Sequence, residues 1–153
     1  MCPRAPASTV LQLDARRTLL REAGDGRDLL AMPIGWEDLA TAFRSPMSSD
    51  DIELAIDLVE DAIGHPRLDI TPVLHVRSDE VRLLGEAAGS TGPDMTLTAE
   101  AVEGLFTRLA RQAAGALSIA DRLPEDARFA ATLVLVRELM HHLGVSTLKI
   151  GPS

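Results

Sequence analysis

The sequence predicts an α/β domain with a mixed five-stranded sheet, in which three antiparallel strands are followed by parallel strands, with helices on both faces. Three short apolar runs separated by turn residues open the chain, and helical patterns then alternate with further apolar runs. The length of 153 residues fits one domain, and 46% hydrophobic residues suffice for its core. We therefore expect a disordered tail at residues 1–8 and a single domain at 9–153.

The first three strands are expected to form an antiparallel meander. Short apolar runs predict strands at Thr9–Asp14, Thr18–Glu22 and Leu29–Ile34. The segment Gly24–Gly26 between the second and third runs is a strong turn signal, because glycine adopts positive φ at no steric cost. The segment between the first and second runs is equally short, so both connections are tight turns.

A long helix is predicted after the meander. Ser48 and Asp51 have the spacing of a capping box, although Asp replaces the usual Glu or Gln. Apolar residues then recur on one helical face as far as Ile63. Gly64 stands where a C-cap glycine belongs, and Pro66 prevents the helix from continuing.

The rest of the chain alternates strands and helices. Val73–Arg77 is a short apolar run that predicts a buried fourth strand, and Ser78 is placed to cap a short helix that ends at Ala88. Gly89–Asp94 is expected to be a loop. Thr98 is placed to cap a second long helix.

A third long helix and a last strand complete the prediction. Pro124 suits the first turn of a helix that runs to Gly144. Its stretch Phe129–Val136 is nonpolar or weakly polar all round, as in helices that are covered on both sides. Val145–Ile150 is the last strand. Parallel strands with helical crossovers after an antiparallel start describe a ribonuclease-H-like lobe of the actin-like ATPase type.

Composition excludes several classes of function. The formal net charge of −8 argues against duplex nucleic acid and anionic membranes as partners, because phosphate neutralisation needs clustered Lys and Arg. The single Cys2 allows neither a disulfide framework nor a zinc cluster within one chain. No apolar run approaches membrane-spanning length and no signal-peptide core is present, so a cytoplasmic location is expected.

Five segments follow one another in the order and spacing of the motifs of a known family. They are Leu30–Trp36, similar to SLPLG; Leu39–Ser49, similar to LTERF…DPPS; Leu97–Leu109, similar to a helix LT…L…L; Leu117–Pro124, similar to LSLEERRALPG; and Leu133–Ile150, similar to ALILLEIMRRLGVERLTV. Together they resemble the C-terminal actin-like lobe of the exopolyphosphatase and guanosine pentaphosphate phosphatase (Ppx/GppA) family. The resemblance implies two lobes around a cleft, glycine-rich loops that hold phosphates, and a catalytic carboxylate in the N-terminal lobe.

The phosphate loops implied by this resemblance are altered here. Matching Val10–Leu13 to the family strand VVDI puts Asp14–Thr18 on its loop GGGST, and Gln12 replaces the strand's Asp. Matching Val73–Gly89 to the corresponding segment puts His75–Asp79 on the loop GTGGT. Neither loop keeps a glycine, and glycine is what lets a backbone approach a phosphate closely. We therefore predict no catalytic residue in this chain.

Candidate ligand-binding residues gather at the ends of two predicted strands. They are Arg16, Arg17, Thr18, Arg77 and Ser78. Ligands bind at such strand ends in open α/β sheets, and three arginines there can hold an anion through charge-assisted hydrogen bonds. In the alternative interpretation the turn arginines are solvated, and Arg77 pairs with Asp79.

The sequence also suggests two kinds of metal site, a helix-borne site and a two-metal nuclease site. Glu138, His141 and His142 have the i, i+3, i+4 spacing of ligands on one helix turn, but the sequence identifies no second ligand-bearing helix, so no metal and no cofactor are predicted. Asp14 at a strand end, with the available carboxylates Asp79, Glu80 and Asp126, invites a two-metal nuclease interpretation. The net charge and the 3% of aromatic residues oppose it.

The predicted function is a non-catalytic single-lobe Ppx/GppA-like protein that acts as an interaction or regulatory module. A homodimer or a complex with a separate partner lobe is expected, because Phe129–Val136 and Ala110–Ala116 suggest a packed helix pair, one helix of which could bury against a second subunit. The alternative is a lobe that binds a phosphate-containing ligand or nucleotide, or a subunit of a split exopolyphosphatase-type hydrolase that cleaves phosphoanhydrides together with a second lobe.

Overall fold

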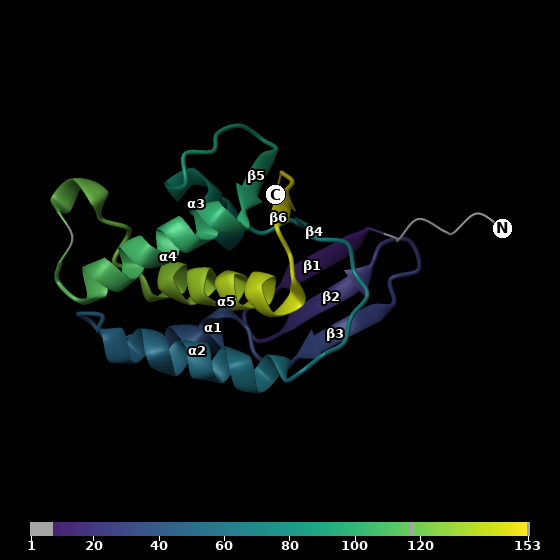
Figure 1. Ribbon diagram of the computed structural model, residues 1–153, viewed down its shortest axis with the longest axis horizontal. Helices are drawn as coiled ribbons and strands as arrows, with labels where there is room; N and C mark the ends of the chain where they lie inside the picture. The colour runs from purple at the N-terminus through teal and green to yellow at the C-terminus, as the bar shows by residue number, and fades with distance from the viewer. Residues whose placement is uncertain (1–7, 117, 153) are drawn as a thin grey trace.

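A mixed six-stranded sheet with the order β3-β2-β1-β4-β6-β5 lies against a layer of helices (Figure 1). The computed structural model describes residues 8–116 and 118–152, so Cys2 and most of the predicted tail lie outside the described residues. The strands are β1 (Thr9–Leu13), β2 (Thr18–Glu22), β3 (Asp28–Met32), β4 (Val73–Val76), β5 (Met95–Thr98) and β6 (Thr147–Ile150). The helices are α1 (Trp36–Ala40), α2 (Ser49–Ile63), α3 (Asp79–Ala87), α4 (Ala99–Ala113) and α5 (Ala127–Leu143), with a 3₁₀ turn η1 (Ile119–Asp121).

The predicted chain order is confirmed in the sheet. β1, β2 and β3 form an antiparallel meander, while β4 pairs in parallel with both β1 and β6. Leu11 of β1 lies opposite Leu20 of β2 and Val76 of β4, and all three are buried. The α/β fold with antiparallel strands first and parallel strands after them is therefore the one expected.

The strand count of five is wrong, because Met95–Thr98 forms a sixth strand antiparallel to β6. Met95 and Leu97 are buried while Thr96 and Thr98 are exposed, which is the alternation of a half-buried edge strand. Thr98 is the last residue of β5 and also the N-cap of α4, where its hydroxyl accepts a hydrogen bond from the Ala101 amide. The prediction of Thr98 as an N-cap is confirmed, but the short strand that ends at the same residue was not predicted.

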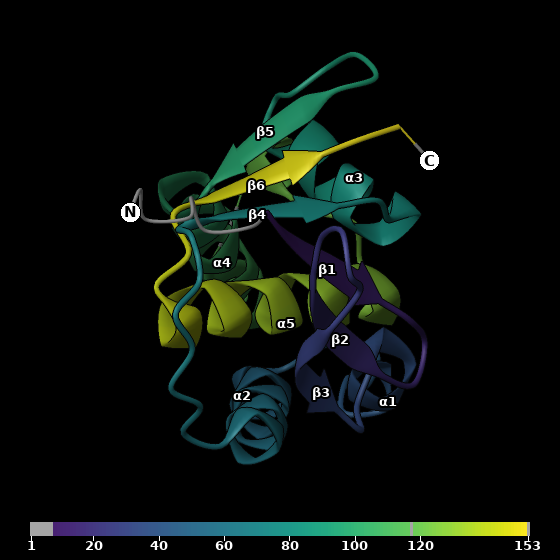
Figure 2. The same cartoon turned by 90° about the vertical axis from the view of Figure 1, so that its right-hand side faces the viewer.

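The expectation of helices on both faces is also wrong, because the described helices lie on one face of the sheet (Figure 2). The crossover from β3 through α1 and α2 to β4, and the connection from β4 to β6, both move toward the β5 edge. Right-handed crossovers that advance in the same direction place their helices on the same face. On the other face Val10, His75, Thr96 and Lys149 are exposed.

Helix α5 forms the centre of the helical layer. Every residue of Phe129–Val136 is buried, and α5 contacts α1, α2, α3 and α4, which confirms that this helix is covered on both sides. The helix begins at Ala127 after the N-cap Asp126, and ends at Gly144 with φ of 67°. Because this apolar run is buried within the chain, it leaves no surface for a second subunit.

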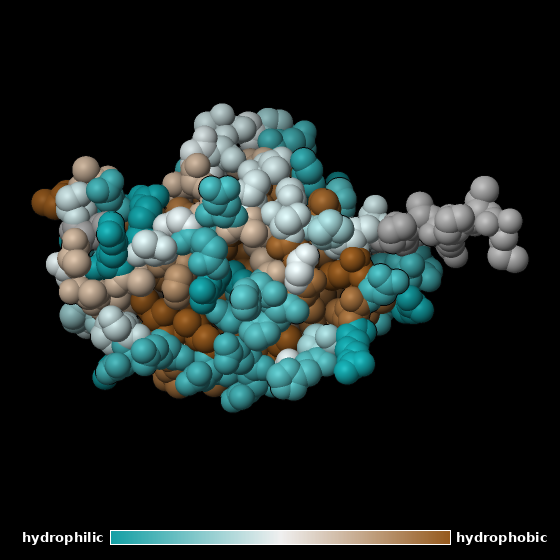
Figure 3. All heavy atoms as spheres, in the orientation of Figure 1, coloured by the Kyte–Doolittle hydropathy of each residue, from teal (hydrophilic) through white to brown (hydrophobic). Residues whose placement is uncertain are grey.

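The predicted caps hold the other helices. The Ser48 hydroxyl accepts from the Asp51 amide at 3.3 Å, and the Asp51 carboxylate accepts from the Ser48 amide at 3.0 Å, which completes the capping box. The short helix α1 was not predicted, and the Asp38 carboxylate accepts from the Gly35 amide at its start. No described helix combines the length and the apolar character needed to cross a membrane. On the face shown in Figure 3, hydrophilic side chains are interspersed with hydrophobic patches.

Candidate functional site

The carboxyl ends of β1, β4 and β6 meet at one edge of the sheet, because these three strands are parallel. The turn Asp14–Arg17 follows β1, Arg77 and Ser78 follow β4, and Gly151 follows β6. The sequence-predicted ligand residues therefore come from neighbouring strands, as expected for the switch point of an α/β sheet.

The turn after β1 is occupied by its own side chains. The Asp14 carboxylate accepts hydrogen bonds from the Gln12 amide group at 2.8 Å and from Arg17 Nε at 3.3 Å. The Asp14 amide donates to the Arg17 carbonyl at 3.0 Å. Arg17 is thus paired with a carboxylate of its own turn.

The same turn packs against the start of α1. Arg16 lies 3.4 Å from a carboxylate oxygen of Glu37 and 3.7 Å from one of Asp38. The Glu37 amide donates to the Ala15 carbonyl at 2.9 Å. The contact is so close that a Cβ atom on Gly35 would lie 2.5 Å from the Ala15 carbonyl oxygen.

Thr18 and Ser78 have structural contacts. The Thr18 hydroxyl, on a residue only 1% exposed, donates to the Ile34 carbonyl at 2.9 Å. The buried Ser78 caps α3, where its oxygen accepts from the Val81 amide and its hydroxyl donates to Glu80 Oε2 at 3.0 Å. These hydroxyls stabilise the strand and helix termini.

Arg77 is the predicted residue that faces an open depression. Among the described residues, it takes part in no ion pair, including the expected pair with Asp79. Its side chain lies over Gly151, since a Cβ atom there would be 3.5 Å from Arg77 Cγ and Nε. The depression has a volume of about 850 Å³ and lies on the uncovered face of the sheet.

Side chains that were not among the predicted ligand-binding residues also line this depression. Its polar members besides Arg77 are Gln12, His75, Asp94, Thr96 and Lys149. Lys149 Nζ donates to the Thr96 hydroxyl at 3.2 Å. Two cationic side chains and an imidazole face one carboxylate here, although the chain as a whole is acidic. The signal that could have located His75 and Lys149 on one face of the sheet is the alternation of residues along β4 and β6, whose burial alternates in the structure.

The rim of the depression is held by Arg82. Its guanidinium donates to the carbonyls of Gly92 at 2.9 Å, Pro93 at 2.8 Å and Gly151 at 3.2 Å. These bonds fix the loop before β5 against the residue after β6. The position of Asp94 therefore depends on Arg82, which donates hydrogen bonds to these three carbonyls.

The carboxylates of the nuclease interpretation do not converge. Asp14 is bound to Arg17, Asp126 caps α5, and Glu80 pairs with Arg128. Burial alone would raise the pKa of Glu80, but the Arg128 hydrogen bond and charge lower it below the ordinary value. Within the described residues, the only group of carboxylates and histidines close enough to share a metal ion is Glu60, Glu138 and His142.

Comparison with solved structures places this architecture among known proteins. The chain matches an Aquifex aeolicus PPX-GPPA enzyme with a TM-score of 0.72 and 12% identity, over 98% of this chain and 54% of that one. It matches an exopolyphosphatase from Cytophaga hutchinsonii with a TM-score of 0.64 and 13% identity, over 97% and 54%. It matches an exopolyphosphatase-like protein with a TM-score of 0.67 and 14% identity, over 97% and 57%.

The fold is that of one half of a Ppx/GppA protein. The chain spans about half the length of the structures it matches, so the resemblance to a single Ppx/GppA lobe is confirmed for the fold. No protein-family model matches the sequence, and no curated protein matches it.

Proposed function

We propose that this chain is a non-catalytic Ppx/GppA-like lobe that acts as an interaction or regulatory module. The observation that carries the proposal is the closed turn after β1, where Arg16 and Arg17 pair with carboxylates of the same chain. A phosphate chain needs exposed backbone amides or unpaired cations at this position. Here the turn lacks glycine, and its backbone contacts α1 instead.

A phosphate-release assay tests the non-catalytic half of the proposal. Purified protein is incubated with Mg²⁺ and polyphosphate, guanosine pentaphosphate or ATP, and the released phosphate is measured. We expect release equal to a buffer blank. Turnover that follows the protein through purification and disappears in Arg77→Ala would overturn the proposal.

The uncovered face of the sheet is the surface that we propose for the partner. It exposes Val10 beside the depression, while the helical face of the sheet is buried by α5 and its neighbours. A second copy of this chain or a separate partner lobe would cover it. A second copy and a separate partner lobe are alternative predictions, and sedimentation of the purified chain distinguishes them.

Sedimentation of the purified chain over a wide concentration range measures self-association. If the partner is a second copy, Val10→Glu shifts the equilibrium to monomer, whereas Leu54→Glu on α2 leaves it unchanged. Both residues are exposed apolar side chains, at 36% and 50% exposure, so they form a matched pair. A monomer at every concentration contradicts the homodimer, and equal effects of the two variants contradict the proposed surface.

A second candidate function is binding of a phosphate-containing ligand. It is favoured by Arg77, Lys149 and His75 in one depression, because anions are held well by charge-assisted hydrogen bonds. The lobe would then bind this ligand either alone or as one subunit of a split hydrolase that cleaves phosphoanhydrides. Of the five residues predicted for this role, Arg77 is the one in the depression.

Thermal shift with phosphate, polyphosphate, ATP and guanosine tetraphosphate tests the ligand hypothesis. A ligand at 100 times its dissociation constant stabilises a protein by about 2.7 kcal/mol. Arg77→Ala should remove the shift, and Arg122→Ala, which changes an exposed arginine outside the depression, should retain it. No shift with any of the four ligands contradicts the hypothesis.

A further inference from the structure

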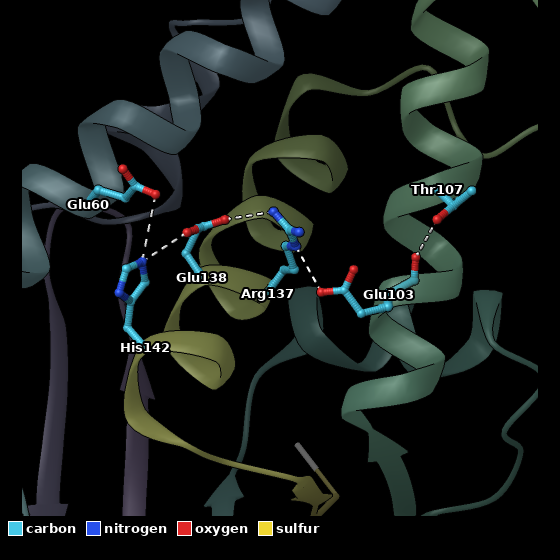
Figure 4. Close-up of polar contacts among 6 residues, drawn as sticks. All are labelled: Glu60, Glu103, Thr107, Arg137, Glu138 and His142. Carbon is cyan, nitrogen blue, oxygen red and sulfur yellow. Dashed lines mark hydrogen bonds and ion pairs between the residues drawn. The ribbon is translucent and has the colours of Figure 1, made fainter.

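We propose that Glu60, Glu138 and His142 form a binding site for a zinc-like divalent ion between α2 and α5. One ligand atom from each residue lies within 4.8 Å of the others (Figure 4). The two helices are far apart in the sequence and pack side by side in the fold. None of these three residues lines the sheet depression or belongs to the proposed interaction surface.

The geometry suits a small ion with short bonds. Glu138 and His142 are four residues apart on α5, so their side chains project from the same helix face. His142 Nε2 lies 3.2 Å from Glu138 Oε2 and 3.8 Å from Glu60 Oε1. Zinc bonds of about 2.0–2.1 Å in a tetrahedron separate neighbouring ligand atoms by about 3.3 Å. The two separations of 3.2 and 3.8 Å lie on either side of this value.

The hydrogen-bonding pattern leaves a place for a cation. Both carboxylates face the same imidazole nitrogen, Nε2 of His142 (Figure 4). A neutral imidazole nitrogen carries at most one proton, so it donates to one of the two carboxylates. A divalent ion would bind both carboxylates and the unprotonated Nε2 together. The competing explanation is a protonated imidazole that serves only as an ion-pair partner.

Glu138 is oriented by a neighbouring network. Its side chain is only 3% exposed, and Oε1 accepts from Arg137 at 2.9 Å, which leaves Oε2 facing His142. Arg137 also donates to Glu103 at 2.9 Å and stacks on the Phe106 ring. Burial alone would lower the pKa of Arg137, but Glu103 and Glu138 raise it, so the guanidinium stays charged. Such outer contacts orient metal ligands in known sites.

The ligand set indicates the class of ion. One imidazole nitrogen and two carboxylate oxygens suit Zn²⁺ and related transition ions, whereas Mg²⁺ and Ca²⁺ prefer oxygen ligands alone. Glu60 and His142 have side chains 49% and 29% exposed, so an ion has access from solvent. Three protein ligands leave a fourth position for water.

Calorimetric titration of metal-free protein with ZnCl₂ at neutral pH tests the site. The Cys2→Ser background is used, because the thiol is a competing zinc ligand. We expect one Zn²⁺ per chain and at least tenfold weaker binding in His142→Ala and in Glu60→Gln. His141→Ala is the matched control, since the adjacent imidazole is not part of the group, and it should bind as the parent does.

Two outcomes overturn the proposal. One is no saturable binding of Zn²⁺ by the parent, which leaves the cluster as an ion pair only. The other is equal weakening by His141→Ala and His142→Ala. Co²⁺ gives a second readout, because nitrogen and oxygen ligation alters its visible absorption, and circular dichroism verifies that each variant is folded.

Discussion

The guanidinium carbon of Arg128 lies 4.0 Å from the ring centroid of Trp36. Arg128 also forms an ion pair with Glu80, whose side chain is 12% exposed. One arginine on α5 therefore connects the first turn of α1 with the first turn of α3. Helix α3 directly follows β4, and the start of α1 is hydrogen-bonded to the turn after β1, so Arg128 links helices that begin beside these two strands.

Replacement of Arg128 by Ala should lower the free energy of unfolding by about 1–2 kcal/mol. It removes a cation–π contact and leaves the largely buried Glu80 without its partner. Because Trp36 is the only tryptophan, its fluorescence reports the change directly, and urea unfolding measures the loss. Arg122→Ala removes an exposed pair with Glu125 and should change stability by less than about 0.5 kcal/mol.

Gly35→Ala should destabilise the protein severely, because the added methyl group would clash with neighbouring backbone atoms. The backbone φ angle at this position is not the cause. A Cβ atom at this position would lie 2.2 Å from the Asp14 carbonyl oxygen, and backbone atoms cannot move aside cheaply. The turn after β1 would separate from α1, at a cost of more than about 2 kcal/mol. Gly104→Ala in α4 meets no atom within 4 Å and should stabilise by up to about 1 kcal/mol. Thermal unfolding of both variants is the measurement, and a Gly35→Ala protein as stable as the parent contradicts the packing described.

Asp51 should make stability depend on pH in the acid range. The hydrogen bond from the Ser48 amide holds the pKa of Asp51 below its ordinary value of 3.8, with further help from Arg44 and against the effect of burial. Because the folded pKa is the lower one, this stabilisation is present above about pH 3.8 and is lost as pH falls through the folded pKa.

Asp51→Asn should therefore cost about 1–2 kcal/mol at pH 7 and progressively less as pH falls below about 3.8, where the parent begins to lose the same stabilisation. Urea unfolding at several pH values measures the difference. Asp50→Asn, which changes the exposed neighbour in the same helical turn, provides the control. A cost for Asp51→Asn that is the same at pH 3 and pH 7 would contradict the assignment.

Gln112→Leu should detach the segment before α5 from α4. The buried Gln112 side chain accepts from the Leu123 amide at 2.7 Å and donates to the Leu123 carbonyl at 3.0 Å. Leucine has a similar size but satisfies neither group, so we expect a loss of about 2–4 kcal/mol. Hydrogen exchange at the Leu123 amide should quicken in the variant, whereas the exposed Arg111→Ala should leave it unchanged.

The helix caps and the meander were predictable because their signals are local. Ser48, Ser78 and Thr98 each precede an apolar helical face, and each accepts a hydrogen bond from an amide three residues on. The strand β5 was not predicted because four residues offer only two periods of alternation. Its identity depends on pairing with β6, which lies about 50 residues later in the chain.

The candidate sites were less predictable than the fold. Spacing drew attention to Glu138 and His142, but Glu60 lies on α2, and only helix packing brings it to them. Arg16 and Arg17 stood at the predicted strand end, yet their partners include Glu37 and Asp38 of a helix that the sequence did not reveal. His75 and Lys149 share a depression because β4 and β6 are neighbours.

Three features are readable from the amino-acid sequence alone: the order of most elements, the caps at the helix ends, and the absence of glycine from the turn after β1 and the loop after β4. These features depend on residues within one or two turns of each other. Three others come from packing in space: the helices cover one face, Arg128 contacts both Trp36 and Glu80, and Glu60 lies beside Glu138 and His142. Such contacts depend on the handedness of the crossovers and on side-chain packing between distant segments, which no local pattern encodes.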